Sequence, residues 1–266
     1  MSYHNPVLLQ ESVQALAIKK DGIYVDVTFG GGGHSKEILN QLGKNGKLFA
    51  FDQDADALQN TIDDSRFILI AENFRFISRY LRFHGIKNVD GILADLGVSS
   101  HQFDESARGF STRFDGDLDM RMNQKAKISA KEIINKYTEQ KLAEILFLYG
   151  ELRNSKNIAK TIVEERQKEK IETSFQLKKV LKKYLPKAVE HKILAQIYQS
   201  FRIEVNEELE ALKEFLNQTP NLLNDKGRLS VISYHSLEDR LVKRFMISGM
   251  FSGEPEKDIY GNSNIP

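Results

Sequence analysis

A glycine-rich stretch near the start of the chain has the residue types of a ligand-binding loop. Four consecutive glycines, residues 30–33, follow the apolar run 23–27, which is typical of a buried parallel strand. Because glycine has no Cβ atom, the backbone of such a loop can adopt positive φ angles and present its N–H groups to a ligand at close range. Ser35 is expected to cap a helix that ends at Gly43. Strand, loop and helix together predict the first βα unit of a nucleotide-binding sheet.

A carboxylate at the end of the next apolar run indicates which ligand the loop holds. Residues 46–51 predict a second strand, and Asp52 follows it about twenty residues beyond the glycines, where a carboxylate can accept hydrogen bonds from ribose hydroxyls. A dinucleotide fingerprint also requires glycine at the sixth position counted from Gly30, and Ser35 stands there. The pattern therefore favours a nucleoside without a pyrophosphate, for which S-adenosylmethionine is the candidate. The alternative interpretation is a glycine-rich turn with Asp52 as a helix cap.

Two further apolar runs end near residues that could line the same site. Residues 67–71 are followed by Phe74, and residues 89–94 are followed by Asp95. Helical patterns separate these runs, and strands that alternate with helices predict an α/β fold with a parallel, doubly wound sheet. Ligands bind such sheets at the carboxyl ends of the strands. We therefore expect the glycine loop, Asp52, Phe74 and Asp95 at one edge of the sheet.

A long polar loop follows Asp95 and extends to residue 122. Loops of this length within a compact domain are usually functional or disordered. The apolar side chains of Phe110, Phe114 and Leu118 argue against disorder. The loop is therefore expected to form either a wall of an active site beside the ligand or a packed surface segment.

The sequence pattern becomes helical between residues 129 and 216. We predict that residues 1–122 and 217–266 form the sheet domain, and that residues 123–216 form an inserted all-helical domain. Residues 151–202 contain thirteen Lys or Arg against six Glu and no Asp, although the whole chain carries a net charge of only +1. Such a local excess is typical of a surface that faces nucleic acid, and also of a solvated helix face.

Strand-like sequence returns after the helical segment. Residues 227–234 predict a strand whose end presents His235, and Ser236 with Asp239 has the pattern of a capping box for the next helix. A histidine at this end of a strand is a candidate for orienting a substrate base or contacting a phosphate. The alternative is a structural hydrogen bond of His235 within the turn.

The composition excludes several classes of site. The 266 residues include no cysteine, so disulfides, thiolate metal sites and cysteine nucleophiles are excluded, and the chain suits a reducing cytoplasm. No cluster of residues has the spacing of metal ligands, and we expect no metal. The first residues lack a signal-peptide pattern, and no apolar run approaches membrane-spanning length. We therefore expect a cytoplasmic protein that does not contact a membrane; the sequence predicts no particular oligomeric state.

Several longer motifs in the same order resemble one family, the bacterial methyltransferases often called MraW or RsmH. These enzymes methylate the 4-amino group of a cytidine in the ribosomal RNA of the small subunit, and the resemblance covers essentially the whole chain. The motifs are His4-x-Pro6-Val7-Leu8-Leu9-x-Glu11, Thr28-Phe29-Gly30 with Gly32-Gly33-His34-Ser35, Asp95 to Ser100 with Gln102, Arg108-Gly109-Phe110-Ser111, Leu148-Tyr149-Gly150-Glu151, Phe201-Arg202-Ile203-Glu204-Val205-Asn206, and Gly227-Arg228-Leu229 through His235-Ser236-Leu237-Glu238-Asp239-Arg240.

The resemblance implies a methyltransferase that depends on S-adenosylmethionine, with a class I (Rossmann-like) sheet and an inserted helical domain that helps to hold RNA. By position, the family's cofactor residues fall on Gly32, Gly33, His34, Asp52, Phe74, Asp95 and Gln102. The loop amides are expected to face the methionine portion, Asp52 the ribose hydroxyls and Phe74 the adenine. The role of Gln102 comes from the resemblance alone.

Methyl transfer from a sulfonium is an in-line displacement, so the enzyme must hold the nucleophile about 3–3.5 Å from the methyl carbon. Cytosine's 4-amino group is a weak nucleophile, and a hydrogen-bond acceptor near it would help the proton to leave. Asp95 is our first catalytic candidate, with a cofactor contact or a helix cap as the alternative, and His235 is the second. The candidates for contacts with the flipped base or its phosphate are Ser99, Ser100, Arg108 and Arg113.

The chain also departs from the family pattern. The family motif that corresponds to residues 115–123 has proline where this chain has Asp117 and aspartate where it has Asn123. The family usually continues beyond Pro266 with a basic tail, and a chain without that tail is expected to have lower RNA affinity or turnover.

Two other classes of protein remain as alternatives. A nucleotide-dependent oxidoreductase would need a complete dinucleotide fingerprint, and a non-catalytic RNA-binding or ribosome-assembly factor would keep only a vestigial cofactor pocket.

Overall fold

The structure is a computed structural model that describes residues 6–253, so His4 of the first motif lies outside the described residues. The chain divides into two compact units, which we describe separately. The sheet unit comprises the residues up to Gly97 together with those from Leu209 onward, and the helical unit comprises Val98–Glu208. No helix within residues 6–253 combines the length and apolar character needed to cross a bilayer.

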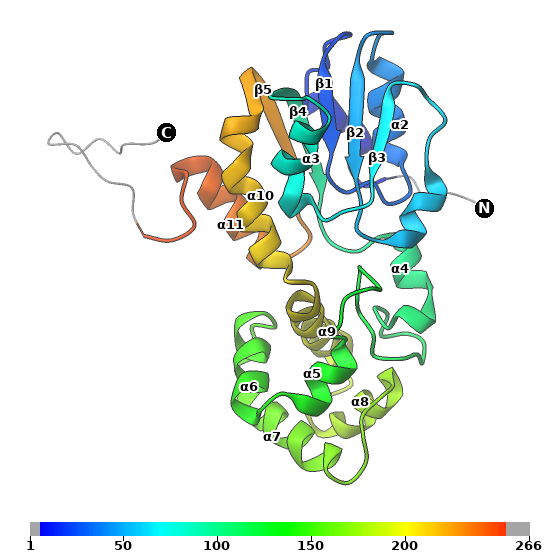
Figure 1. The fold of residues 1–266 in the computed structure, drawn as a ribbon. Helices are drawn as coiled ribbons and strands as arrows, with labels where there is room; N and C mark the ends of the chain where they lie inside the picture. Colours follow the sequence, from blue (N-terminus) through cyan, green and yellow to red (C-terminus); the bar gives the residue numbers. More distant parts are fainter. Residues whose placement is uncertain (1–5, 254–266) are drawn as a thin grey trace, which may run out of the picture. The chain divides into compact units, whose positions relative to one another are not determined.

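A five-stranded sheet with parallel pairing throughout is the centre of the sheet unit (Figure 1). Its strands are β1 (Ile23–Asp26), β2 (Lys47–Phe51), β3 (Phe67–Ile70), β4 (Val89–Asp95) and β5 (Leu223–Ile232), in the spatial order β3-β2-β1-β4-β5. The chain moves from β1 outward to β3 and then returns to the other side of β1 with β4. Such a reversal opens a crevice beyond the carboxyl ends of the two central strands, where ligands of open α/β sheets bind. The predicted α/β class is therefore confirmed.

Helices cover both faces of this sheet because alternate strand residues point to opposite sides. Tyr24, Leu48 and Leu93 pack in one cluster with residues of the first two helices, whereas Val25 and Phe49 belong to a second cluster on the other face. The second cluster also contains residues of α3, α10 and α11. The helical segments of this unit are α1 (Leu9–Ala15), α2 (Gly33–Gln41), α3 (Ile77–Phe83), α10 (Glu208–Leu222) and α11 (Ser236–Ser248), with the short 3-10 helices η1 (Ala55–Asn60) and η2 (Phe74–Phe76).

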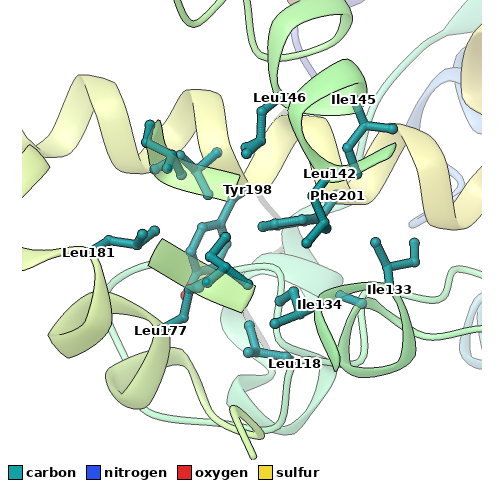
Figure 2. Packing of buried hydrophobic residues seen from close by; sticks show 14 of the residues in the cluster. Leu118, Ile133, Ile134, Leu142, Ile145, Leu146, Leu177, Leu181, Tyr198 and Phe201 are labelled. Carbon is teal, nitrogen blue, oxygen red and sulfur yellow. The ribbon is translucent and has the colours of Figure 1, made fainter. Parts of the chain in front are cut away.

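The helical unit packs its helices around a core of its own (Figure 2). Its segments are α4 (Ser100–Asp104), η3 (Ser106–Arg108), α5 (Ala130–Lys136), α6 (Glu139–Leu148), α7 (Ser155–Arg166), α8 (Ser174–Val180), η4 (Lys182–Tyr184) and α9 (Glu190–Asn206). Tyr198 and Phe201 of α9 lie in the centre of this core, surrounded by leucines and isoleucines from α5, α6 and α8 (Figure 2). Alternation of apolar and polar residues at the helical period explains why these segments bury one face each.

The boundaries between the units differ from the predicted ones at residues 122/123 and 216/217, and the packing explains the difference. Phe110, Leu118 and Met120 of the long loop are buried in the core of the helical unit, so the loop belongs to that unit. Asn206 of α9 holds the loop by donating to the Met120 carbonyl (2.8 Å). In contrast, Phe215 of α10 is buried in the second cluster of the sheet unit. The change of sequence pattern marked the helices, but not the surface on which each segment packs.

Candidate active site

The glycine loop carries the chain from β1 into α2 through backbone conformations that favour glycine. Gly30 and Gly32 have φ angles of 50° and 76°, in the region where a Cβ atom would cause strain. Gly32 is the N-cap residue of α2, which begins at Gly33. The expected cap at Ser35 is therefore wrong, because Ser35 lies inside the helix. The first amides of α2 are at the positive end of the helix dipole, where they can bind an electronegative group.

Asp26 anchors both ends of the glycine loop by hydrogen bonds. This fully buried carboxylate at the end of β1 accepts hydrogen bonds from the Ser35 hydroxyl (2.7 Å) and the Thr28 amide (3.1 Å). The Thr28 hydroxyl in turn accepts a hydrogen bond of 2.7 Å from the Asp95 amide, which joins the ends of β1 and β4. Burial raises the pKa of Asp26 above its ordinary value, and the Ser35 hydroxyl opposes this rise. The function of Asp26 in holding the loop was missed from the sequence, although its place in an apolar strand was a signal.

Asp52, which follows β2, binds the first glycine of the loop. Its two oxygens accept hydrogen bonds from the Gly30 amide and the Asp54 amide, each 2.8 Å long. Burial raises the pKa of Asp52 to about 6, although both hydrogen bonds oppose the rise. Each carboxylate oxygen has a second lone pair, so these bonds leave acceptor capacity for ribose hydroxyls. The cap of the following helix η1 is Asp54, whose side chain accepts from the Asp56 amide.

Asp95 ends β4 at the centre of the candidate site. Its Oδ1 accepts a hydrogen bond of 2.8 Å from the Tyr234 hydroxyl, and its Oδ2 lies 3.8 Å from Nδ1 of His34. Burial raises the pKa of Asp95, whereas the Tyr234 hydrogen bond and His34 act in the opposite direction. Tyr234 follows β5 and keeps 54% of its surface exposed. Tyr234 could not be chosen from the sequence, because only the pairing of β5 with β4 brings it to Asp95.

His34 lies in the first turn of α2 with its ring buried. Its Nε2 is 3.2 Å from the Val7 carbonyl oxygen, and its Nδ1 faces Asp95. The ring thus connects the segment before α1 to the end of β4. His34, a predicted cofactor residue, therefore lies beside Asp95, the first catalytic candidate.

Phe74 and His235 lie at the ends of other strands and have different surroundings. The half-buried Phe74 ring meets Phe215 of α10 edge-on, with ring centroids 5.4 Å apart.

His235 is the N-cap residue of α11, so the expected capping box with Ser236 at the N-cap is wrong. Nε2 of His235 lies 3.1 Å from a carboxylate oxygen of Glu238. The other Glu238 oxygen accepts from the Tyr234 amide (3.0 Å). Neither buried ring nitrogen of His235 has a hydrogen-bond partner among the described residues, so the structural hydrogen bond that the sequence offered as the alternative is not observed. A catalytic role of His235 stays a prediction.

The remaining predicted residues belong to the helical unit. Gln102 and Ser99 form the capping box of α4, in which the Ser99 amide donates to Oε1 of Gln102 (3.0 Å) and the Gln102 amide donates to Oγ of Ser99 (3.2 Å). Ser100, the first residue of α4, is exposed, whereas Gln102 is buried. Capping of α4 thus already accounts for Gln102 and Ser99. A cofactor contact of Gln102 stays a prediction.

The two predicted arginines of the long loop differ in exposure. Arg108 is buried, and its guanidinium donates to the carbonyl oxygens of Arg121 (2.9 Å) and Met122 (3.2 Å). A contact between Arg108 and RNA would require these bonds to open. Arg113 is exposed and lines a cavity of about 520 Å³ within the helical unit, together with aromatic side chains that include Phe103 and Tyr198.

The structure thus joins the glycine loop, Asp52, His34 and Asp95 by direct contacts within the sheet unit. The sequence profile of the MraW methylase family matches residues 1–255. The chain is 66% identical over 266 residues to the ribosomal RNA small subunit methyltransferase H of Flavobacterium johnsoniae, covering 100% of this chain and 88% of that protein. It is 65% identical to the protein of the same name from Christiangramia forsetii, with the same coverage. The corresponding protein of Bacteroides fragilis is 54% identical over 265 residues, covering 100% of this chain and 87% of that protein.

Proposed function

We propose, since the chain belongs to the MraW methylase family, that it transfers a methyl group from S-adenosylmethionine to the 4-amino group of a cytidine in 16S ribosomal RNA. The names of its relatives, ribosomal RNA small subunit methyltransferase H, support ribosomal RNA as the substrate. The observation that carries the proposal is the contact of Asp95 with Thr28 and His34, the residues on either side of the glycine loop, at the reversal of strand order. We further propose that the enzyme acts in the cytoplasm on small subunits that are assembled or nearly so.

The residues at the sheet edge suit S-adenosylmethionine. The amides of Gly33 and His34 would hold the methionine carboxylate at the start of α2, where the helix dipole favours a negative group. The Gly32 amide donates to the Phe29 carbonyl (2.8 Å), so Gly32 would contribute by letting the ligand approach the backbone closely. Asp52 would accept hydrogen bonds from the ribose hydroxyls, and the exposed part of Phe74 would pack on the adenine. When bound, the cofactor supplies an electrophilic methyl group on a sulfonium.

Asp95 is the residue that we assign to the target amine. Its carboxylate would accept a hydrogen bond from the 4-amino group, orient the nitrogen lone pair, and stabilise the charge that develops as the amine attacks. The Tyr234 hydroxyl holds Oδ1, so Oδ2 is the oxygen that we assign to the amine. We assign His235 no part in this step; its Nε2 lies 3.1 Å from a Glu238 oxygen.

The helical unit would supply a large part of the affinity for RNA. The excess of Lys and Arg in residues 151–202 suits the phosphate backbone. The cavity beside Arg113 offers aromatic walls and a cation, which are the groups that hold an unstacked base and its phosphate. Ser99, Ser100 and Arg113 remain our candidates for this contact, and Arg108 would support the loop that carries them.

The test is transfer of labelled methyl groups from S-adenosylmethionine to small subunits that lack the modification, with the product nucleoside identified by mass spectrometry. Wild type, Asp52→Ala and Asp95→Asn would be compared, and cofactor binding would be measured separately by calorimetry. We expect 4-methylated cytidine from the wild type, loss of cofactor binding in Asp52→Ala, and loss of transfer with retained binding in Asp95→Asn. A methyl group on another atom would contradict the cytosine assignment. Absence of cofactor binding by the wild type would favour the non-catalytic assembly factor.

A further inference from the structure

The outer face of α3 carries a row of arginines that the proposed catalytic site does not use. Arg75, Arg79 and Arg82 recur at intervals of four and three residues, so they project from one side of η2 and α3. They line a groove of about 660 Å³ together with Phe76, Phe83 and Gln218. We call this feature the α3 groove. All its residues belong to the sheet unit.

Two phenylalanines accompany the arginines. Phe83 is 82% exposed and Phe76 is 41% exposed, whereas the neighbouring Ile77 and Leu81 of the same helix are fully buried in the core. The helix therefore has apolar side chains on both of its faces, and only one face is needed to attach it to the sheet. Exposed aromatic rings beside cations are the groups on which unpaired nucleic-acid bases stack.

Two of the three arginines of the α3 groove lack a carboxylate partner. Arg75 forms a two-bonded ion pair with Glu214 of α10, at 2.8 and 2.9 Å. Arg79 and Arg82 are exposed, and neither forms an ion pair with any carboxylate among residues 6–253. The lining contains no acidic residue. The Arg79 guanidinium lies over the Tyr80 ring, 5.9 Å from its centroid, which leaves its charge in place. Two guanidinium groups without an ion pair on one helix face suit phosphate oxygens, because their planar fork can donate two parallel hydrogen bonds.

The floor of the groove is held in place by α10, which lies beside α3 (Figure 1). Gln218 accepts a hydrogen bond from the Ser78 amide (3.2 Å) and donates one to the Arg75 carbonyl (2.8 Å). Arg75 directly follows Phe74, which we assign to the adenine of the cofactor. The groove therefore begins at the carboxyl edge of the sheet and continues along α3, away from that edge.

We propose that the α3 groove binds a single-stranded segment of RNA, with Arg79 and Arg82 on phosphates and Phe83 stacked on a base. This inference rests on the proposed function and adds to it an RNA contact on the sheet unit itself. Such a contact would let both units of the enzyme hold the same RNA.

The test compares Arg79→Ala/Arg82→Ala and Phe83→Ala with a control, Lys44→Ala/Lys47→Ala. The control removes two exposed positive charges from the sheet unit at the start of β2, outside the groove. Binding of a short fluorescent single-stranded RNA would be measured by anisotropy over a range of salt concentrations, with thermal melting to verify folding. Methyl transfer to small subunits would be measured in parallel.

We expect the double arginine variant to bind RNA at least tenfold more weakly and to lower the slope of log affinity against log salt by about 1.4, since each phosphate contact with a single strand contributes about 0.7. Phe83→Ala should weaken binding by about fivefold or more with no change in this slope. Cofactor affinity should stay unchanged in every variant.

RNA affinities equal to that of the control would overturn the proposal. So would unchanged RNA binding combined with an altered sedimentation coefficient, which would assign the groove to a protein contact. If the wild type binds RNA through the groove but transfers no methyl group, the proposed function fails and the groove assignment stands. If the wild type transfers methyl groups and the groove variants match the control, only the groove assignment fails.

Discussion

The Tyr234 hydroxyl donates a hydrogen bond of 2.8 Å to Oδ1 of Asp95 and so joins the ends of two neighbouring strands, β4 and β5. The contact restricts the rotation of the Asp95 carboxylate and leaves Oδ2 toward His34. The Tyr234 ring also lies against Gly97, where a Cβ atom would come within 3.3 Å of it. The side chain that we assign to the target amine is thus positioned by a residue far away in the sequence.

Tyr234→Phe should lower kcat about tenfold, because a hydrogen bond to a charged group contributes about 1.5–3 kcal/mol and here also orients the carboxylate. Since the Tyr234 hydroxyl lowers the pKa of Asp95 against the effect of burial, its removal should raise that pKa. The acid limb of the kcat/KM profile should then move to higher pH, because the role proposed for Asp95 requires its ionised form. Methyl-transfer rates measured between pH 5 and 9 would check both effects.

Tyr137→Phe is the matched control for this experiment. Tyr137 also donates its hydroxyl to a carboxylate, Glu204, at 3.1 Å, but it lies in the helical unit. The control should keep the wild-type pH profile. An unshifted acid limb in Tyr234→Phe would argue against Asp95 as the group that titrates.

Asp52 should make cofactor binding depend on pH. Its pKa of about 6 in the free protein means that the carboxylate is protonated in mild acid, and a protonated oxygen loses part of its capacity to accept from ribose hydroxyls. The affinity for S-adenosylmethionine should therefore rise as the pH increases through 6. Calorimetric titrations at several pH values would measure this rise, and Asp52→Asn should bind more weakly with little dependence on pH in this range.

The same raised pKa has a consequence for stability. Between the ordinary value of about 3.9 and the folded value of about 6, the native protein binds more protons at Asp52 than the unfolded chain does. The contribution of Asp52 to the free energy of unfolding therefore decreases as pH rises through this window, by at most about 2 kcal/mol. Denaturant unfolding at pH 4.5 and 7.5 would test this contribution. The free energy of unfolding at pH 7.5 minus that at pH 4.5 should be more positive in Asp52→Asn than in the wild type.

Ser35→Ala should destabilise the sheet unit by about 1–3 kcal/mol, because it removes a hydrogen bond from the fully buried Asp26 carboxylate. Ser248→Ala is the matched control, since the Ser248 hydroxyl is bonded only to nearby carbonyl oxygens of the chain. The control should cost less than Ser35→Ala, because its acceptors are neutral carbonyl groups and not a buried carboxylate. Equal losses in the two variants, measured by urea unfolding, would contradict a special role for the Asp26–Ser35 pair.

The sequence was sufficient for β1 to β4, because each of these strands is an apolar run that ends at or just before a polar residue. Asp52 and Asp95 could be placed at the ligand edge for the same reason. The fifth strand, predicted at residues 227–234, instead spans Leu223–Ile232, because its first half is polar and exposed and carries no strand pattern. The hydrogen bond from Tyr234 to Asp95 could not be predicted, because it depends on the register in which Ile232 pairs with Asp95. Nor could the start of α2, since serine and glycine both suit an N-cap and only the loop geometry selects Gly32.

The long loop shows a second limit of sequence patterns. The sequence made both Arg108 and Arg113 candidates for contact with the flipped base or its phosphate. Arg108 is nevertheless buried, because the neighbouring apolar residues Phe110 and Met120 pack into the helical core and draw the arginine with them. Its guanidinium then satisfies carbonyl groups of the same loop. Composition alone does not distinguish such an internal arginine from one that is available to RNA.

Arg108→Ala and Arg113→Ala should therefore affect different properties, the first stability and the second RNA binding. Loss of the buried Arg108 removes hydrogen bonds to two carbonyl oxygens and its packing over the Phe110 ring, so we expect a loss of about 2–3 kcal/mol in the stability of the helical unit. Arg113→Ala should leave the melting temperature unchanged, because its side chain is exposed. It should instead lower RNA affinity and reduce the salt slope by about 0.7. Thermal melting and RNA anisotropy on both variants would check this division, and a fully stable Arg108→Ala with weakened RNA binding would return Arg108 to the RNA-contacting residues.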